Sequence, residues 1–282
     1  MLTVLDVIKK SADFLSLKGV ESARLNAETI VGHVLQLNRM KLYLQFDRVL
    51  TEDQINAIRT HIMRRGKREP LQYIIGYVDF SGIRIKVDKR ALIPRPETEY
   101  LIEKIKQKYI ISKPNYILDL GTGSGVIALA LANIYTEARI LAVDKDEDAL
   151  KLAKENVELL EYKERVNLLN SSWFESISKS ENFDLIISNP PYLSNIQVEQ
   201  ADIEVKMYEP HNALISSDEG MADILDILSN AHKWMNKGGL LALETGESQH
   251  EEIIKIAFKY GYKNIESFSD LAGRERYILC NN

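Results

Sequence analysis

The sequence predicts an α/β protein in which a mostly parallel sheet, with helices on both faces, follows a small bundle of helices. Three observations support this prediction. Residues 1–70 repeat apolar side chains at helical spacing, and residues 116–260 alternate short apolar strands with amphipathic helices. The last two apolar runs then follow one another without a helix between them. We therefore expect seven strands in the sheet, the last two of them antiparallel.

The first 70 residues contain helix signals only. Ala27, Ile30, Val31 and Val34 recur at helical spacing, and similar patterns lie before and after them. Thr51 is a good N-cap, because acidic residues follow it in the first turn of the next predicted helix. Since no strand-like alternation interrupts these patterns, residues 1–70 predict a helical bundle.

Residues 71–95 predict a β-hairpin linker. Two strand-like runs, 73–78 and 83–87, flank the turn residues 79–82. The linker ends in the proline-containing segment I-P-R-P-E-T-E at 93–99, after which a helix is expected through Ile105.

Strand and helix patterns alternate from residue 116 onward, which is typical of a parallel sheet with crossover helices. Helices are expected at 126–134, 147–160, 221–234 and 250–260. The seven strands are expected at 116–120, 140–143, 166–170, 183–188, 239–244, 265–268 and 276–280.

Composition excludes several classes of protein. Hydrophobic residues make up 45% and charged residues 27%, as in an ordinary globular protein, and the longest apolar stretch is too short to cross a bilayer. The N-terminus has no signal-peptide pattern, so we expect a cytoplasmic protein without membrane contact. Cys280 is the only cysteine, and the five histidines lack metal-ligand spacing, so no metal site is expected.

Charge is unevenly distributed. Residues 1–95 contain 17 basic and 10 acidic residues, whereas residues 96–282 contain 19 and 31. The acidic second part is a poor surface for nucleic acid, so no direct nucleic-acid binding is expected. The basic first part fits an acidic partner or a solvated helix surface. The densest basic cluster, with the same two alternatives, is Arg59, Arg64, Arg65, Lys67 and Arg68.

A glycine loop follows the first predicted strand of the sheet and leads into a helix. Such a loop lets backbone approach a ligand, and Asp144, at the end of the next strand, is placed to hold ribose hydroxyls. Asp119, just before the loop, would repel phosphate and suits a cationic ammonium, which favours S-adenosylmethionine over a dinucleotide. The alternative is a glycine-rich turn with capping aspartates. The loop residues are Gly121, Thr122, Gly123, Ser124 and Gly125.

A rigid polar elbow, Asn189-Pro190-Pro191-Tyr192, ends the buried strand 183–188. The two prolines stiffen the backbone and impose no ladder partner on the Pro190 carbonyl. The Asn189 side-chain oxygen and this carbonyl can together accept hydrogen bonds from one planar NH₂ group, beside which Tyr192 offers a flat face. Two acceptors would stabilise positive charge on that nitrogen during methyl transfer. The alternative is a proline-rich turn capped by asparagine.

These motifs together resemble the release-factor glutamine N5-methyltransferases, the PrmC/HemK family. The residues that carry the resemblance are N-P-P-Y at 189–192, D-L-G-T-G-S-G at 119–125 and I-P-R-P-E-T-E at 93–99. Further matches are S-W-F at 172–174, Y-E-P at 208–210 and A-G-R at 272–274, and the helical front part also matches. N-P-P-Y alone is shared with adenine-N6 and guanine-N2 methyltransferases. The segment I-S-S-D-E-G-M at 215–221 departs from the family, where relatives usually show more glycine.

The resemblance implies a Rossmann-like, seven-stranded methyltransferase domain at 96–282, after a helical substrate-binding domain at 1–70 and the hairpin linker at 71–95. It implies methyl transfer from S-adenosyl-L-methionine to the side-chain nitrogen of the glutamine in the Gly-Gly-Gln motif of class-1 peptide chain release factors. A monomer is expected.

The resemblance also implies residue roles. Residues 121–125, Asp144 and Trp173 would line the cofactor site, and Asn189 would touch both cofactor and glutamine. Pro190, Pro191 and Tyr192 would complete the substrate clamp, with Asn189, Pro190 and Tyr192 as the catalytic group. Trp173 has the alternative of a core aromatic.

Some assignments stay open in the sequence. Arg95 and Glu97 fit either the roof of the active site or the start of a helix. A DNA or RNA exocyclic-amine N-methyltransferase is the alternative enzyme, but it would need a basic groove and a module that reads the target. A cofactor-binding regulator without catalysis would have no use for the Asn189 elbow.

Overall fold

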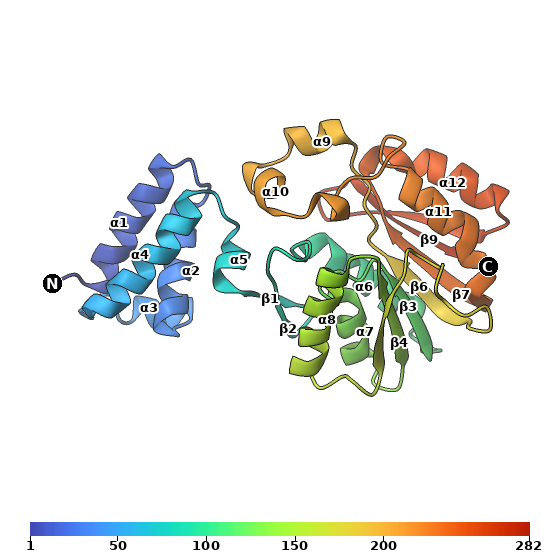
Figure 1. Ribbon diagram of the computed structural model, residues 1–282, viewed down its shortest axis with the longest axis horizontal. Coiled ribbons are helices and arrows are strands. Elements are labelled where there is room, and N and C mark those ends of the chain that lie inside the picture. The colour runs from blue at the N-terminus through green and yellow to red at the C-terminus, as the bar shows by residue number, and fades with distance from the viewer. The chain divides into compact units, whose positions relative to one another are not determined.

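A computed structural model describes all 282 residues, which fold into two units (Figure 1). The first unit comprises Met1–Gly76 together with Asp202–Tyr208. The second comprises Tyr77–Ala201 and Glu209–Asn282. The predicted boundaries at residues 70 and 95 remain a prediction, and the short segment 202–208 contacts the first unit although it lies far along the chain.

Helices alone build the first unit, and within it the helices predicted for residues 1–70 are confirmed. Thr3 and Thr51 each cap a helix with a capping box, in which the threonine side chain and the third residue of the helix exchange hydrogen bonds. Apolar faces of the longer helices meet in a common core that includes Val4, Ile30 and Ile58. The helices are α1 Val4–Leu17, α2 Ala23–Leu35, α3 Arg39–Tyr43, α4 Glu52–Gly66, α5 Leu71–Ile75 and α10 Ile203–Tyr208.

The first strand expected in the linker, 73–78, is wrong. Residues 71–75 form helix α5, Gly76 ends it with a left-handed φ of 87°, and strand β1 starts only at Tyr77. Tyr73 and Ile74 are buried, and Leu71 and Ile75 pack against the core of the first unit. Local β-propensity is therefore overridden by packing on the helical core.

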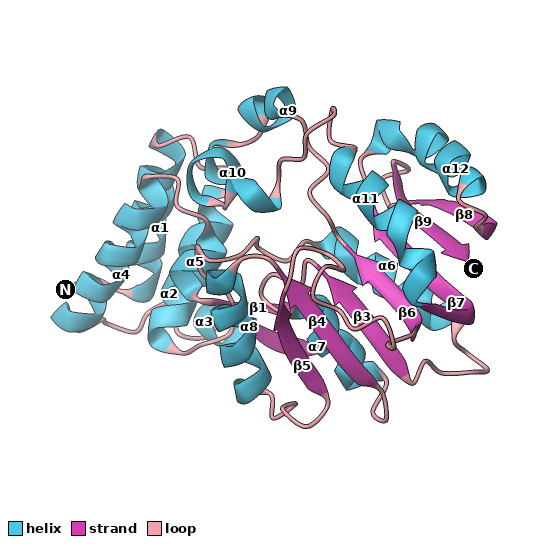
Figure 2. Cartoon of the chain, turned by 45° about the vertical axis from the view of Figure 1, so that its right-hand side comes forward, coloured by secondary structure: helices cyan, strands magenta, loops and turns pink.

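The second unit is built on a seven-stranded sheet with strand order β5-β4-β3-β6-β7-β9-β8 (Figure 2). Neighbouring strands are parallel except β9, which runs antiparallel to both β7 and β8, so the predicted sheet and its antiparallel end are confirmed. The strands are β3 Tyr116–Leu120, β4 Arg139–Asp144, β5 Val166–Asn170, β6 Phe183–Ser188, β7 Met235–Glu244, β8 Lys263–Ser269 and β9 Glu275–Asn281.

Helices cover the sheet on both faces, because alternate residues of each strand point to opposite sides. Leu118 and Leu120 of β3 share one core with Ile224 of α11 and Ile253 of α12. The helices of this unit are α6 Pro96–Lys108, α7 Val126–Ile134, α8 Glu147–Leu159, α9 Asn195–Gln200, α11 Ala222–Ala231 and α12 His250–Lys259. Three 3₁₀ turns lie at His211–Ala213, His232–Trp234 and Glu247–Gln249.

Helices α9 and α10 were not predicted from the sequence. Each has six residues, too few to show an apolar period. The local signal for α9 is the capping box between Ser194 and Gln197.

The hairpin of β1 Tyr77–Phe80 and β2 Ile83–Lys86 is held against the sheet unit. The fully buried Asn156 of α8 accepts a hydrogen bond from the Lys86 backbone N–H (2.8 Å). Its Nδ2 donates to the carbonyl oxygens of Lys86 (3.0 Å) and Ser124 (2.9 Å). One side chain thus joins the hairpin to the glycine loop.

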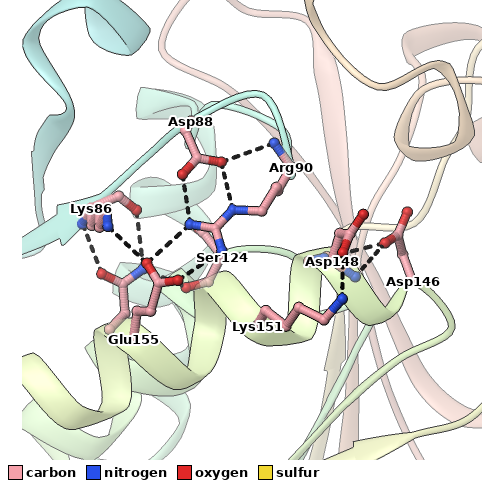
Figure 3. Close-up of polar contacts among 10 residues, drawn as sticks. Lys86, Asp88, Arg90, Ser124, Asp146, Asp148, Lys151 and Glu155 are labelled. Atoms are coloured by element: carbon pink, nitrogen blue, oxygen red, sulfur yellow. Dashed lines mark hydrogen bonds and ion pairs between the residues drawn. The ribbon is translucent and has the colours of Figure 1, made fainter.

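An ion-pair cluster reinforces the same junction (Figure 3). The Arg90 guanidinium pairs with Asp88, two residues before it, and with Glu155 of α8, each at 2.7 Å. Lys86 also pairs with Glu155 (2.8 Å). The segment that leaves the hairpin is thereby fixed beside Ser124.

Candidate active site

The predicted site residues come from loops that follow β3, β4, β5 and β6. Since carboxyl ends of parallel strands meet at one edge of a sheet, these loops surround a common cleft there. The cleft encloses about 920 Å³ of empty space, part of it open to solvent. Of the predicted site residues, its wall contains Gly121, Thr122, Gly123, Ser124, Asp144, Trp173, Asn189 and Pro191. Gly125, Pro190 and Tyr192 lie outside the wall.

Gly121 has a left-handed φ of 72°, which favours glycine in the loop after β3. A Cβ there would lie 3.4 Å from the Trp173 ring, so the loop backbone runs close to this ring. The backbone N–H groups of Gly121 and Thr122 both donate to the Val143 carbonyl of β4, at 2.8 and 2.9 Å. The loop is therefore shaped by the sheet itself and presents bare backbone to the cleft.

Asp119 lies beneath this loop and not on the cleft wall. Its Oδ2 accepts hydrogen bonds from the Thr122 hydroxyl (2.6 Å) and the Ala128 N–H (3.1 Å), while its Oδ1 has no partner. Burial raises the pKa of Asp119 to about 7. The observed contacts of Asp119 organise the turn into α7, and the side chain that was expected to suit a cationic ammonium does not line the cleft.

Asp144 does line the cleft. Its Oδ2 accepts from the Gly123 N–H (2.8 Å) and its Oδ1 from the Asp146 N–H (2.9 Å). Burial raises the pKa of this carboxyl, and the two backbone hydrogen bonds oppose that rise. Each oxygen keeps a lone pair for a further donor, so the carboxylate can accept from two neighbouring hydroxyl groups.

Trp173 was expected either to line the cofactor site or to be a core aromatic, and its position combines both. Its ring lines the cleft and also packs against the core of the sheet unit. Its indole N–H donates to Asp223 (3.2 Å), and its φ of 45° is unusual for a bulky residue. Backbone and hydrogen bond together fix the ring next to Gly121.

Asn189 is hydrogen-bonded to the buried Thr98, which is in turn hydrogen-bonded to the buried Glu244. Its Nδ2 donates to the Thr98 hydroxyl oxygen (3.3 Å), and the Thr98 hydroxyl donates to Oε2 of Glu244 (2.7 Å). The other carboxylate oxygen, Oε1, accepts from the Tyr192 hydroxyl (3.3 Å). Arg276 lies 3.4 Å from that hydroxyl and over the Tyr192 ring. Burial raises the pKa of Glu244, whereas the Thr98 hydrogen bond and the Arg276 charge lower it.

Thr98 and Glu244 were missed as site residues by sequence reasoning. Thr98 lies in the quoted segment 93–99, where only Arg95 and Glu97 received a role. Glu244 is an acid at the carboxyl end of an apolar strand, as Asp144 is, and this position was the available signal.

Arg95 and Glu97 separate into different environments. Arg95 lines the cleft, and its guanidinium donates to both oxygens of the buried Glu209 at 2.7 and 2.9 Å. Glu97 lies in the first turn of α6, outside the cleft wall, and pairs with Arg274 (3.5 Å). Arg95 thus fits the roof of the cleft and Glu97 the start of the helix.

The basic cluster of the first unit is largely paired within that unit. Arg64 pairs with Glu69 (2.6 Å), and Arg65 and Arg68 both pair with Glu204 of α10, at 2.8 and 2.7 Å. These three arginines hold the unit together, which neither of the two sequence interpretations had considered.

Comparison with known proteins adds two family matches. The model of the PrmC N-terminal domain matches residues 6–76, and that of the methyltransferase small domain matches residues 96–218. No helix of the structure combines the length and apolar character needed to cross a membrane.

Several relatives described as release factor glutamine methyltransferases match nearly the whole chain. The one from Rhodopirellula baltica is 38% identical over 281 residues, covering 98% of this chain and 95% of the relative. The one from Aliivibrio fischeri is 34% identical, covering 99% and 97%. That from Thermodesulfovibrio yellowstonii is 39% identical, covering 90% of each.

Solved structures with low sequence identity share the fold. A methyltransferase from Pyrococcus furiosus has a TM-score of 0.53 at 19% identity, covering 71% of this chain and 89% of that protein. A 16S rRNA methyltransferase from T. thermophilus, in complex with AdoMet and guanosine, has a TM-score of 0.53 at 15% identity, covering 73% and 49%. The sheet unit therefore has the architecture of methyltransferases.

Proposed function

This chain belongs to the release factor glutamine methyltransferases, and we propose that its cleft holds a methyl donor beside the glutamine that accepts the methyl group. The chain is a methyltransferase whose protein substrate is a release factor. The proposed acceptor is the side-chain amide nitrogen of the glutamine in the Gly-Gly-Gln motif of class-1 release factors.

The cleft wall fits S-adenosylmethionine as the donor, which supplies a methyl group from its sulfonium. Asp144 offers two oxygens with free lone pairs, which suits the paired hydroxyls of a ribose. The Trp173 ring offers an aromatic surface for adenine, and the loop at 121–125 brings backbone close without side-chain bulk. The Asp144 carboxylate on the cleft wall also makes the site unfavourable for a phosphate.

The substrate clamp in this proposal consists of Asn189 Oδ1 and the Pro190 carbonyl. Both would accept hydrogen bonds from the NH₂ group of the glutamine and so fix its nitrogen in the cleft. An amide nitrogen is a weak nucleophile because its lone pair is delocalised into the carbonyl. Two acceptors stabilise the positive charge that develops on this nitrogen, and the proton can leave to solvent afterwards. Pro191 and Tyr192 would complete the clamp.

Finer properties of the protein are part of the same proposal. The helical unit, with the exposed apolar residues Leu17, Met40 and Leu44, would contact the release factor. We expect a monomer that works in the cytoplasm and makes no direct contact with nucleic acid.

One observation carries the proposal: Asn189, Asp144 and the glycine loop line the same cleft. The test is incubation of the chain with labelled S-adenosylmethionine and a class-1 release factor. Label should appear on the Gly-Gly-Gln glutamine, and a Gln→Ala release factor should stay unlabelled. Label in DNA or RNA but not in release factor would favour the amine methyltransferase. Tight cofactor binding without transfer would favour a regulator.

A further inference from the structure

We propose that Thr98 and Glu244 are positioning residues that decide which branch of the Asn189 amide faces the substrate. This inference rests on the proposed role of Asn189 in the clamp. A carboxamide has an oxygen branch and an NH₂ branch of similar shape, and only the oxygen can accept from a glutamine NH₂. The clamp therefore needs hydrogen-bonding contacts that fix the orientation of the Asn189 amide.

Three segments that are distant in sequence supply these contacts. Thr98 lies in the first turn of α6 and is 2% exposed, and Glu244 ends β7 and is 1% exposed. Asn189 follows β6, and it lines the cleft together with Thr98. The hydrogen bonds run from Asn189 Nδ2 to Thr98 Oγ1 (3.3 Å) and from Thr98 Oγ1 to Glu244 Oε2 (2.7 Å).

The direction of this chain of hydrogen bonds follows from counting protons. An ionised carboxylate only accepts, and a hydroxyl has one proton to donate. Because Thr98 donates its proton to Glu244, its oxygen can only accept from Asn189. The branch of Asn189 that faces Thr98 must then be NH₂, and Oδ1 is turned away from Thr98. An inverted amide would set two acceptors against each other without a proton between them.

The surroundings of Glu244 favour its role as acceptor. Tyr192 donates to its other oxygen, and Arg276 provides a nearby positive charge. Burial and the negative charge of Glu97 raise the pKa of Glu244 and so oppose its ionised, accepting form. With Oε1 occupied by Tyr192, Oε2 is left to Thr98.

Glu244→Gln should reverse the direction of the chain of hydrogen bonds. The Gln oxygen would stay toward the donor Tyr192, so the Gln NH₂ would face Thr98. Thr98 would accept from Gln and donate to Asn189, which turns Oδ1 inward and NH₂ toward the substrate. We expect kcat to fall about 100-fold, the loss that follows removal of one charge-stabilising contact.

Thr98→Val should cut the chain of hydrogen bonds without reversing it. The amide then has no imposed orientation, so kcat should fall about 10-fold, less than in Glu244→Gln. In the double variant kcat should equal that of Thr98→Val, because Glu244 acts on Asn189 only through Thr98. Thr98→Ser keeps the hydroxyl that donates to Glu244 and accepts from Asn189, so its kcat should be about half that of wild type or more.

A matched control lies one residue along the chain. The hydroxyl of the fully buried Thr245 is hydrogen-bonded to His250 (2.8 Å) and to the Arg276 carbonyl (3.4 Å), and not to Asn189. Thr245→Val removes a similar hydroxyl and should leave kcat unchanged. All variants should keep KM for release factor and the dissociation constant of the cofactor within about threefold of wild type, a shift small beside the expected kcat losses.

A second measurement does not depend on turnover. The side-chain NH₂ signals of Asn189 in ¹⁵N NMR, assigned by their loss in Asn189→Ala, report the partner of Nδ2. These signals should shift in Glu244→Gln and Thr98→Val and stay in place in Thr245→Val and Thr98→Ser. Thermal unfolding of each variant checks that it is folded, and Glu244→Gln still tests the inference if Thr98→Val does not fold.

Two results would overturn the inference. One is a double variant whose kcat loss equals the product of the two single losses. The other is Thr98→Val with the kcat and NH₂ signals of wild type. If wild-type protein transfers no label to release factor, the proposed function fails instead, and the NMR result still tests the orientation of Asn189.

Discussion

Asn189 has two hydrogen-bonding branches, and the structure gives one of them to the protein interior. The Nδ2 branch is used by Thr98, so the Oδ1 branch remains for a ligand in the cleft. Asp144 has a different arrangement, since both of its oxygens already accept one backbone hydrogen bond and keep room for another. The two residues should therefore fail in different ways when they are replaced.

Asn189→Ala should reduce turnover far more than cofactor binding. It removes an acceptor that matters most while charge develops on the nitrogen, so kcat should fall by about 10²–10³-fold. Single-turnover kinetics and calorimetric titration with cofactor measure the two effects separately. Asp144→Ala is the matched comparison, with cofactor affinity lost first. Equal losses of binding and turnover in Asn189→Ala would assign Asn189 to the cofactor.

Asp119 should make stability depend on pH near neutrality. Burial raises the pKa of this carboxyl from an ordinary 3.8 to about 7 in the folded protein. Between these values the folded state binds more protons than the unfolded state, so the contribution of Asp119 to stability falls as pH rises through this window. The loss amounts to about 1.4 kcal/mol for each unit of pKa shift.

The measurement compares urea unfolding of wild type and Asp119→Asn between pH 5 and 8. The free energy of unfolding of wild type, relative to that of the variant, should decrease with rising pH. The exposed Asp13→Asn is the control, and its difference from wild type should stay constant. A difference for Asp119→Asn that does not change with pH would contradict the expected ionisation.

At the scale of elements, the hairpin and the glycine loop depend on one helix. Helix α8 supplies Asn156, which binds backbone groups of Lys86 and Ser124, and Glu155, which pairs with Lys86 and Arg90. The hairpin therefore does more than connect two parts of the chain. It covers α8 and fixes the segment that contributes Arg90 and Ala91 to the cleft wall.

Asn156→Ala should loosen this junction. It leaves three backbone groups without their partner, and one buried unsatisfied group costs about 1–3 kcal/mol. Urea unfolding should show a loss at least that large, and cofactor affinity should fall because the loop at Ser124 is less fixed. Asn133→Ala, on the exposed side of α7, is the control and should change neither quantity. If Asn156→Ala is destabilised but binds the cofactor as tightly as wild type, the junction of hairpin and glycine loop does not affect cofactor binding.

At the scale of the whole molecule, the first unit is built from two separate stretches of chain. Residues 202–208 join it through Glu204, which pairs with Arg65 and Arg68, and through the Tyr208 hydroxyl, which donates to the Lys67 carbonyl (2.7 Å). The chain therefore leaves the sheet unit shortly after the Asn189 elbow and returns to it at Glu209.

Glu204→Gln should release α10 from the first unit. Burial raises the pKa of Glu204, but the hydrogen bonds from Arg68 and Arg65 outweigh this effect and lower the pKa to about 2. The stabilisation is thus present above the ordinary value of 4.5 and is lost as pH falls toward 2. At neutral pH the variant should be destabilised by about 1–3 kcal/mol, since the pair is only partly buried.

Limited digestion with trypsin reads out the release of α10, which contains Lys206. Cleavage after Lys206 should be faster in Glu204→Gln than in wild type at neutral pH. Glu158→Gln, which removes an exposed ion pair with Lys163, should be digested like wild type. Equal cleavage rates in all three proteins would show that Glu204 does not hold α10.

The sequence by itself determined the sheet and the loops at its carboxyl edge. Strands 116–120, 166–170 and 183–188 and helix 126–134 were predicted with their observed bounds, because apolar period and flanking breakers are local properties. Glycine at 121 and proline at 190 and 191 restrict the backbone by their own covalent structure, so their meaning is also local.

Only the tertiary structure decided which side chains support these loops. Thr98 and Glu244 are 146 residues apart, Asn156 and Lys86 are 70 apart, and Arg65 and Glu204 are 139 apart. No local pattern encodes such pairs, since each residue taken alone resembles an ordinary polar residue of a helix or a strand end. The same reason explains the wrong strand at 73–78, where packing on the helical core overrode β-propensity. Short-range preferences fix the elements, and the orientation of the Asn189 amide depends on contacts that exist only after the elements have packed.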